Sequence, residues 1–343
     1  MQTPIFSTRD ASNGILALCQ AAEERRRYRE RIPLLPQDDS DEETDSTSPI
    51  YDQFYGAGGA ESIVKMINFS PEEFHSLWIQ VDEFIINNWN VGKGKKSEIK
   101  PKDVLFMTLT VFKHGGTWDF LANTFKLKAA RFEKLITGFI KKIAPFIYDK
   151  FALEHRRSID MMKLFQTNRR FNHHPCALYA TDVTFQQSNR PTGNIQEAKV
   201  YYSGKHKLYG YKVEVSVIPI GLAIHCTSHY PGSYSDIDIF RRNIRFHEEK
   251  LKKRSTGIQD GGILQNEHPH QWAVLTDKGY QGLQEIIRAI HPVKAKPNVR
   301  LTASEISFNM DVSSDRIIVE NFFGRLCSLW EICSRRYRWS ENL

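Results

Sequence analysis

The chain has 343 residues, and 41% of them are hydrophobic, which is enough to build the core of one large domain or of two domains. It has no apolar stretch long enough to span a bilayer and no basic-then-apolar leader, so we expect neither a membrane protein nor a secreted one. The five cysteines include no Cys-x-x-Cys pair, which favours a reduced intracellular compartment and argues against a zinc knuckle.

The formal charge of +7 understates how basic the body of the chain is. Residues 38–45 contain six acidic residues and no basic one, and setting these six aside leaves +13 for the rest. A basic body with an acidic tail suits a polyanion partner such as nucleic acid, although cationic surfaces also serve solubility.

The first half of the sequence predicts helices. Residues 1–50 are expected to form a charged, disordered tail with a short helix at 23–31. Residues 51–97 are expected to hold a helix over 66–89 and a basic linker, and Ser70-Pro71-Glu72-Glu73 has the residues of a helix start. Residues 98–150 predict three helices: one that begins at Pro101, a short one over 118–125, and one from 129 that ends near Pro145.

A short helix, a tight turn and a longer helix form the pattern of a DNA-binding helix-turn-helix, although any three-helix bundle gives the same pattern. Four basic residues surround the turn and begin the third helix, where a recognition helix contacts DNA. They are Lys126, Lys128, Arg131 and Lys134.

From residue 170 to 343 we expect an α/β domain. Strands are predicted over 177–181, 208–217 and 222–228, where neighbours pair as an antiparallel meander. A helix over 236–251, a strand over 273–276, a helix over 281–290, a strand over 292–296 and final helices follow. This is the element order of the ribonuclease H-like fold, a mixed sheet flanked by helices, in which the first and fourth strands lie side by side.

Three acidic residues stand in distinct settings within this order: Asp182, Asp277 and Glu320. The two aspartates each follow an apolar run that predicts a buried strand, and the glutamate lies on an amphipathic late helix. Strand tips at a sheet edge are where ligands bind in open α/β folds. Each acid alone also has an ordinary role, as a turn or cap residue or as a surface partner of Arg316 or Arg325. Together they predict a site for hard cations such as Mg²⁺.

Five sequence blocks, in order, resemble DDE superfamily endonucleases, the transposases of the IS5 and PIF/Harbinger group. The blocks are 181–186, 202–214, 230–236, 277–280 and 309–326. The resemblance implies that Asp182, Asp277 and Glu320 form a metal-binding triad with Mg²⁺ or Mn²⁺, two ions in all. It implies cleavage and strand transfer of double-stranded DNA at transposon ends and target, by a homo-oligomer when active, in the nucleus if the source is eukaryotic. Related elements often encode a Myb-like DNA-binding partner.

Two departures from the family pattern keep another function open. Val183 stands where glycine is frequent, and Cys327-Ser328-Leu329 follow the final block instead of basic residues. The alternative is a domesticated, catalytically weak protein that binds DNA or protein. An RNA-directed nuclease is a third class, but a helix-turn-helix favours duplex DNA because A-form RNA hides its major groove.

Other polar residues carry weaker hypotheses. Lys205, Lys207 and Lys212 alternate with tyrosines around the second strand and are either phosphate contacts or a solvated face. Asp236 is expected to be a first-turn helix acid. The pair His173-His174 lacks partners at ligand spacing and is expected to be structural.

Overall fold

The computed structural model describes residues 46–192, 194–254 and 257–339. The predicted helix over 23–31 and the acidic run therefore lie outside the described residues, whereas Pro49 and Ile50, predicted as tail, begin the first described helix. No helix of the described ranges is both long enough and apolar enough to cross a membrane.

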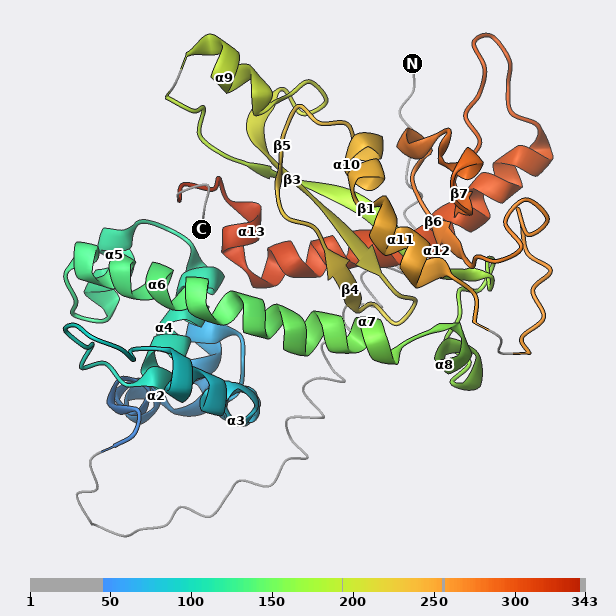
Figure 1. Ribbon diagram of the computed structural model, residues 1–343. Coiled ribbons are helices and arrows are strands. Elements are labelled where there is room, and N and C mark those ends of the chain that lie inside the picture. The colour runs from blue at the N-terminus through green and yellow to red at the C-terminus, as the bar shows by residue number, and fades with distance from the viewer. Residues whose placement is uncertain (1–45, 193, 255–256, 340–343) are drawn as a thin grey trace.

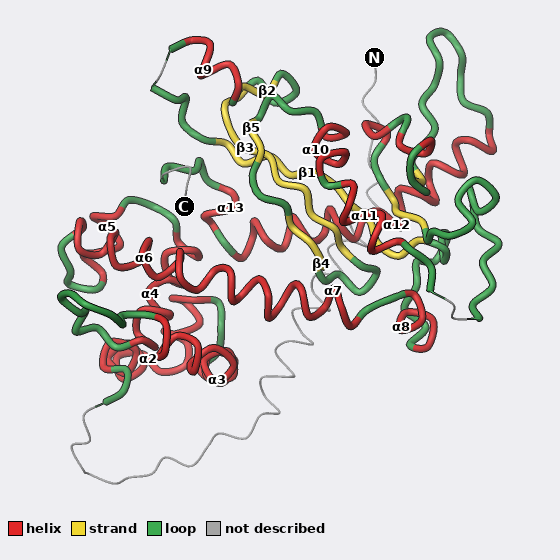
Figure 2. Tube along the Cα trace, viewed as in Figure 1, coloured by secondary structure: helices red, strands yellow, loops and turns green. Residues whose placement is uncertain are grey.

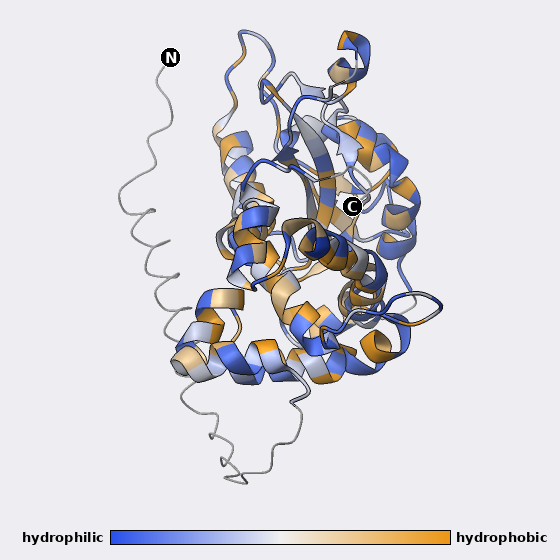
Figure 3. Cartoon of the chain, turned by 90° about the vertical axis from the view of Figure 1, so that its left-hand side faces the viewer, coloured by the Kyte–Doolittle hydropathy of each residue, from blue (hydrophilic) through white to orange (hydrophobic). Residues whose placement is uncertain are grey.

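The N-terminal part is built of helices alone, as Figure 2 shows. Its helices are α2 (Pro49–Ile67), α3 (Pro71–Asn88), α4 (Pro101–His114), α5 (Trp118–Thr124) and α6 (Ala129–Ile147). Hydrophobic and hydrophilic residues alternate along them (Figure 3), and the apolar faces meet in one core that includes Phe74, Phe106 and Phe132. Because α2 and α3 share this core with α4–α6, residues 51–97 pack as part of the same helical unit.

The predicted helix starts are confirmed in part. Ser70 and Glu73 form the reciprocal capping box at the start of α3, but the expected helix over 66–89 breaks at Asn68, whose φ of 65° is left-handed. The helix expected to end at Pro145 instead continues to Ile147. It then becomes a π-helix, η1 (Tyr148–Leu153), and ends in α7 (Glu154–Ser158), so the wider turns begin just after the proline that interrupts the hydrogen-bond ladder.

The C-terminal part is a mixed sheet in the order β2-β3-β1-β6-β7. The strands are β1 (Ala177–Gln187), β2 (Tyr202–Ser203), β3 (Leu208–Val217), β4 (Ala223–Cys226), β5 (Tyr230–Pro231), β6 (Ala273–Leu275) and β7 (Ala289–Ile290). Strand β1 is antiparallel to β3 and parallel to β6, and both β4 and β5 pair with β3. The expected neighbourhood of the first and fourth strands is thus confirmed by the pairing of β1 with β6.

Helices cover both faces of this sheet (Figure 1). The remaining elements are α8 (Met161–Gln166), α9 (Ile195–Val200), α10 (Asp236–Arg242), α11 (Ile244–Leu251), the 3-10 turns η2 (Lys278–Tyr280) and η3 (Leu283–Glu285), α12 (Ala303–Leu329) and α13 (Glu331–Ser334). Helix α12 packs Val312 and Val319 on one face of the sheet, and Phe240 and Phe246 of α10 and α11 pack on the other. This mixed sheet between helices is consistent with a ribonuclease H-like domain.

Several predicted boundaries are wrong. The helix expected over 236–251 breaks at Asn243, whose side-chain amide donates to the buried Glu214 at 2.7 Å. Residues 281–290 form η3 and β7 instead of a helix, and residues 292–296 are not a strand. Gly282 has a φ of 93°, and Arg288 is fully buried in an ion pair with Asp260, so this segment is held against the loop that precedes β6 by a polar contact that apolar periodicity does not reveal.

Helix α12 is fixed in register by the buried residue Asp315. Its carboxylate accepts backbone hydrogen bonds from Asn172, His173 and His174 and lies 3.0 Å from Nδ1 of the buried His174. Burial alone would raise the pKa of Asp315, but the hydrogen bonds from His174 hold it below its ordinary value. The His173-His174 pair is therefore structural, as expected.

We expect Asp315→Ala to lower the free energy of unfolding by about 2–4 kcal/mol, because two buried and two part-buried donors lose a charged acceptor. The matched control is Asp311→Ala, one turn earlier, where the half-exposed carboxylate pairs with His173 at 3.1 Å; it should cost under about 1 kcal/mol. Urea denaturation of both variants at pH 7 measures the difference, and equal losses would show that Asp315 is not the anchor of α12.

Candidate active site

Asp182 lies on the part of β1 that extends beyond its parallel neighbour β6. The paired residues of β1 and β6 end at Ala180 and Leu275, and β1 itself continues to Gln187 in register with β3. Asp182 is therefore inside a strand, not at its tip as predicted, because the antiparallel partner β3 extends the strand beyond the apolar run. It still stands at the edge that β6 leaves open, where burial along β1 changes from complete to partial.

Asp277 reaches the same edge from the next strand. It follows β6 and stands at the N-cap position of η2, but its side chain makes no capping hydrogen bond. The helix-capping alternative for this residue is thus not what the structure shows. About a third of the side chain is exposed, and its carboxylate faces α12.

One guanidinium joins the two aspartates. Arg316 of α12 is buried, with Nη2 lying 3.2 Å from Oδ2 of Asp182 and Nη1 lying 3.5 Å from Oδ1 of Asp277. Sequence reasoning considered Arg316 only as a partner for Glu320 and missed this bridge. The signal that could have found it is spacing, since Arg316 precedes Glu320 by four residues and so shares its face of the helix.

The bridge does not fully compensate the negative charge at this edge. Burial raises the pKa of Asp182 to about 6, against the opposing effects of Arg316 and of the Val183 backbone N–H, which donates to Asp182 at 2.8 Å. The charges of Asp277 and Asp236 raise it further. A carboxylate that resists ionisation beside two others is a place where an added cation lowers the free energy of the charged form.

Glu320 lies one turn beyond Arg316 on α12. Its residue is exposed, and it forms no ion pair with any residue that the structure describes. Within the described ranges there is also no group of three or more His, Cys, Asp or Glu side chains placed to hold a metal ion. The structure thus brings Asp182 and Asp277 together through Arg316, whereas the participation of Glu320 in one ligand set stays a prediction.

The two aspartates have the donor chemistry that a hard cation requires. Their carboxylate oxygens face one partly exposed edge, and oxygen donors of this kind are the ligands that hard cations prefer. Asp182 and Asp277 therefore fit as ligands of Mg²⁺ or Mn²⁺.

Asp236 is engaged by lysines instead. It opens α10 as expected, and Nζ of Lys212 lies 2.8 Å from its Oδ1 while Nζ of Lys205 lies 3.5 Å from its Oδ2. Lys212 is also buried and donates to the carbonyl of Tyr234. Lys212 is therefore a structural partner of Asp236 and not an accessible phosphate contact, whereas Lys205 and Lys207 are exposed.

A buried polar network beneath the site also escaped the sequence analysis. Glu214 of β3 is fully buried, and its Oε1 lies 3.1 Å from Nε2 of His247 and accepts a hydrogen bond from Asn243. Nδ1 of His247 meets the hydroxyl of Tyr179 at 2.8 Å. Such a network fixes α10 and α11 on the sheet, and no local sequence pattern marks its members.

The four basic residues of the suggested helix-turn-helix are exposed around α5 and α6. Lys126 has a φ of 54° in the turn, Lys128 caps α6, and Arg131 pairs with Glu98 at 3.2 Å. Helix α5 packs on α6, but packing of this kind is shared by many helical bundles. A DNA-binding role for Lys126, Lys128, Arg131 and Lys134 stays a prediction.

The C-terminal part of the chain is similar to known proteins. Residues 180–342, which include Asp182, Asp277, Arg316 and Glu320, match the family described as DDE superfamily endonuclease. This part of the chain is therefore similar to members of that family. A curated relative, the "Probable transposase for insertion sequence element IS702" of Microchaete diplosiphon, is 27% identical over 162 residues, which cover 47% of this chain. The match covers 50% of that relative, so the chain spans about half of its length. No solved structure matches the chain.

The raised pKa of Asp182 predicts a pH-dependent stability. Because its folded-state pKa of about 6 exceeds the ordinary value of 3.8, the folded chain holds the proton more tightly, and ionisation destabilises the fold as pH rises from about 4 to about 6. We expect Asp182→Asn to be more stable than the wild type at pH 7, on the order of 1–2 kcal/mol, and equal to it at pH 4. Thermal unfolding at both pH values measures this.

The control for this prediction is Asp119→Asn, which removes an exposed carboxylate from α5. It should not reproduce the pH-dependent gain. Mg²⁺ should also raise the melting temperature of the wild type more than that of Asp182→Asn. A stability gain of Asp182→Asn that is the same at pH 4 and pH 7 would contradict a raised pKa of Asp182 in the folded chain.

Proposed function

We propose that this chain is a divalent-metal-dependent DNA endonuclease and transposase, with Asp182, Asp277 and Glu320 as its metal-binding carboxylates. The observation that carries the proposal is the pair of aspartates at the open end of β6, joined by Arg316 inside a segment that is similar to the DDE superfamily endonucleases. The relative named as a probable transposase supports strand transfer in addition to cleavage.

Each residue has a defined task in this mechanism. Asp182 and Asp277 would hold the ions between neighbouring parallel strands, and Glu320, one turn from Arg316, would complete the ligand set. When bound, two Mg²⁺ or Mn²⁺ ions supply a deprotonated water or 3′-hydroxyl for in-line attack and stabilise the leaving 3′-oxygen. Arg316 would keep the aspartates together and partly neutralised before a cation arrives. No side chain acts as a covalent nucleophile.

The broader proposals follow from the same assignment. Duplex DNA is the proposed substrate, recognised in part by the α5–α6 helix-turn-helix. A Myb-like partner protein, a homo-oligomeric active form and a nuclear location in a eukaryotic source remain hypotheses that the family resemblance suggests.

The decisive experiment is nicking of supercoiled DNA by the full chain with Mg²⁺, Mn²⁺ or EDTA. We expect Asp277→Asn to abolish metal-dependent nicking and to leave DNA binding equal or slightly stronger, because one charge that repels phosphate is removed. Glu320→Gln should also abolish nicking. The control Glu285→Gln removes an exposed carboxylate from η3 and should nick normally. Unchanged nicking by Asp277→Asn would overturn the proposed site.

The helix-turn-helix proposal has its own test. Replacing Lys128 and Lys134 with glutamine should weaken duplex binding and lower the log–log salt slope by about 0.9 for each phosphate that the protein no longer neutralises. The control replaces Lys141 and Lys142, which are exposed two turns further along α6, and should change the slope less. Fluorescence anisotropy in EDTA measures both slopes, and equal slopes for the two double variants would argue for a general basic surface.

A further inference from the structure

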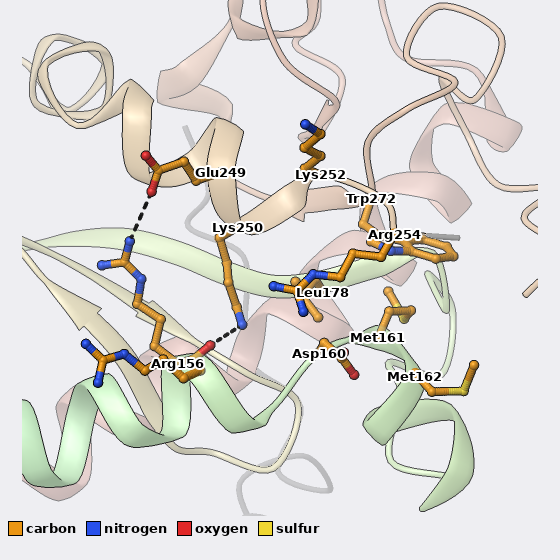
Figure 4. Close-up of a pocket in the computed structure, with 11 residues that line it drawn as sticks. Arg156, Asp160, Met161, Met162, Leu178, Glu249, Lys250, Lys252, Arg254 and Trp272 are labelled. Carbon is orange, nitrogen blue, oxygen red and sulfur yellow. Dashed lines mark hydrogen bonds and ion pairs between the residues drawn. The ribbon is translucent and has the colours of Figure 1, made fainter. Parts of the chain in front are cut away.

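A basic cavity lies at the end of the sheet opposite the aspartates. It has a volume of about 220 Å³ and is lined by residues of α7, the start of α8, α11 and the segment after α11 (Figure 4). Leu178 and Trp272 form part of its wall. Leu178 lies on β1 four residues before Asp182, and Trp272 directly precedes β6, which is followed by Asp277. The cavity therefore lies beside the start of these two strands, and the carboxylate edge lies further along them.

Cations dominate the lining of this cavity. They come from α7, α11 and the segment after α11, and all five line the cavity: Arg156, Arg157, Lys250, Lys252 and Arg254. Two carboxylates, Glu249 and Asp160, also line it. Glu249 is largely exposed and meets Arg156 at 3.7 Å, and Oδ1 of Asp160 accepts from the backbone of Lys163 to cap α8. These two carboxylates offset part of the positive charge, but five basic residues against two acidic ones leave the lining net positive.

Lys250 is the fixed centre of the cluster. Its ammonium donates to the carbonyl oxygens of Arg156 and Ile159, the latter at 2.6 Å, and forms no ion pair with a described residue. Burial lowers the pKa of Lys250 to about 8, and the charges of Arg156 and Arg254 lower it further against the effect of Asp160. An anion in the cavity would remove this cost.

We propose that this cavity is a phosphate-binding site that takes a backbone phosphate of duplex DNA outside the cleavage site. Arginine forks and lysine ammonium groups on two sides of one cavity match the oxygens of a phosphate. The proposal rests on the proposed function, because DNA is the substrate assumed there.

The fold also supplies a path for the DNA. Arg156 and Arg157 end the continuous helix that begins as α6 at Ala129, beside the suggested helix-turn-helix. Thirty residues of helix at 1.5 Å each span roughly 45 Å, the length of about 13 base pairs. One duplex that follows this helix can reach both basic ends.

The test compares two double variants of the full chain. Lys252→Gln with Arg254→Gln removes two exposed cations of the cavity, and neither pairs with a described residue. The matched control, Lys163→Gln with Arg245→Gln, removes two exposed cations from α8 and α11 that do not line it. Binding of a 30-base-pair duplex is measured in EDTA as a function of salt, with melting temperatures to check folding.

We expect the cavity variant to lower the log–log salt slope by about 0.9 for each phosphate that is left without a cation, while the control slope stays close to that of the wild type. Equal slopes for the two variants would overturn the proposal. Inorganic phosphate forms a second arm. If phosphate raises the melting temperature of the wild type but not of the cavity variant, and the DNA slopes do not differ, the site takes free phosphate and the DNA assignment is overturned.

Nicking of supercoiled DNA with Mg²⁺ by the wild type separates this inference from the proposed function. If the chain binds DNA through the cavity but does not nick DNA with any metal ion, the proposed endonuclease function is overturned and the phosphate site is kept. If the chain nicks DNA but the cavity variant and the control have the same salt slope for DNA binding, the phosphate site is overturned and the endonuclease function is kept.

Discussion

The candidate active site depends on one interaction, the contact of the Arg316 guanidinium with the carboxylates of Asp182 and Asp277. These aspartates come from parallel neighbours whose backbones end their pairing just before them. Without a cation between them, two carboxylates at a partly buried edge repel each other. Arg316 reduces this repulsion but leaves the pKa of Asp182 at about 6, so the site is stable enough to fold and still favours more positive charge.

The neighbouring residue on α12 explains how that contact is maintained. Asp315 is bound by the backbone of the segment that leads into β1, and Arg316 follows it directly in sequence. The helix can therefore neither slide nor rotate without breaking buried hydrogen bonds. Asp315, which anchors the helix, and Arg316, which contacts the two aspartates, are thus consecutive residues. Glu320 lies one turn further along the same helix.

The sequence predicted the mixed sheet flanked by helices, the adjacency of β1 and β6 and the proximity of Asp182 and Asp277, because apolar runs and the order of elements can be recognised along the chain. It did not predict Arg316 as a bridge, the buried pairing of Lys212 with Asp236 or the ion pair of Arg288 with Asp260, since each joins residues that are far apart in sequence. The predicted helix over 281–290 was wrong for the same reason. Periodicity shows which residues are apolar, whereas long-range polar contacts decide how short segments pair.

The two strands β1 and β6 separate charge along their length. At their open end lie carboxylates that favour cations, and at their beginning lies a cluster of cations around Lys250 that favours anions. The apolar residues between them, such as Ala180 and Val274, are fully buried and hold the two groups of charges apart along the strands. The repulsion between the carboxylates and a polyanion at the basic end falls with this distance. In a chain whose overall charge is positive, this arrangement lets phosphate bind strongly while the reacting edge is left for metal ions.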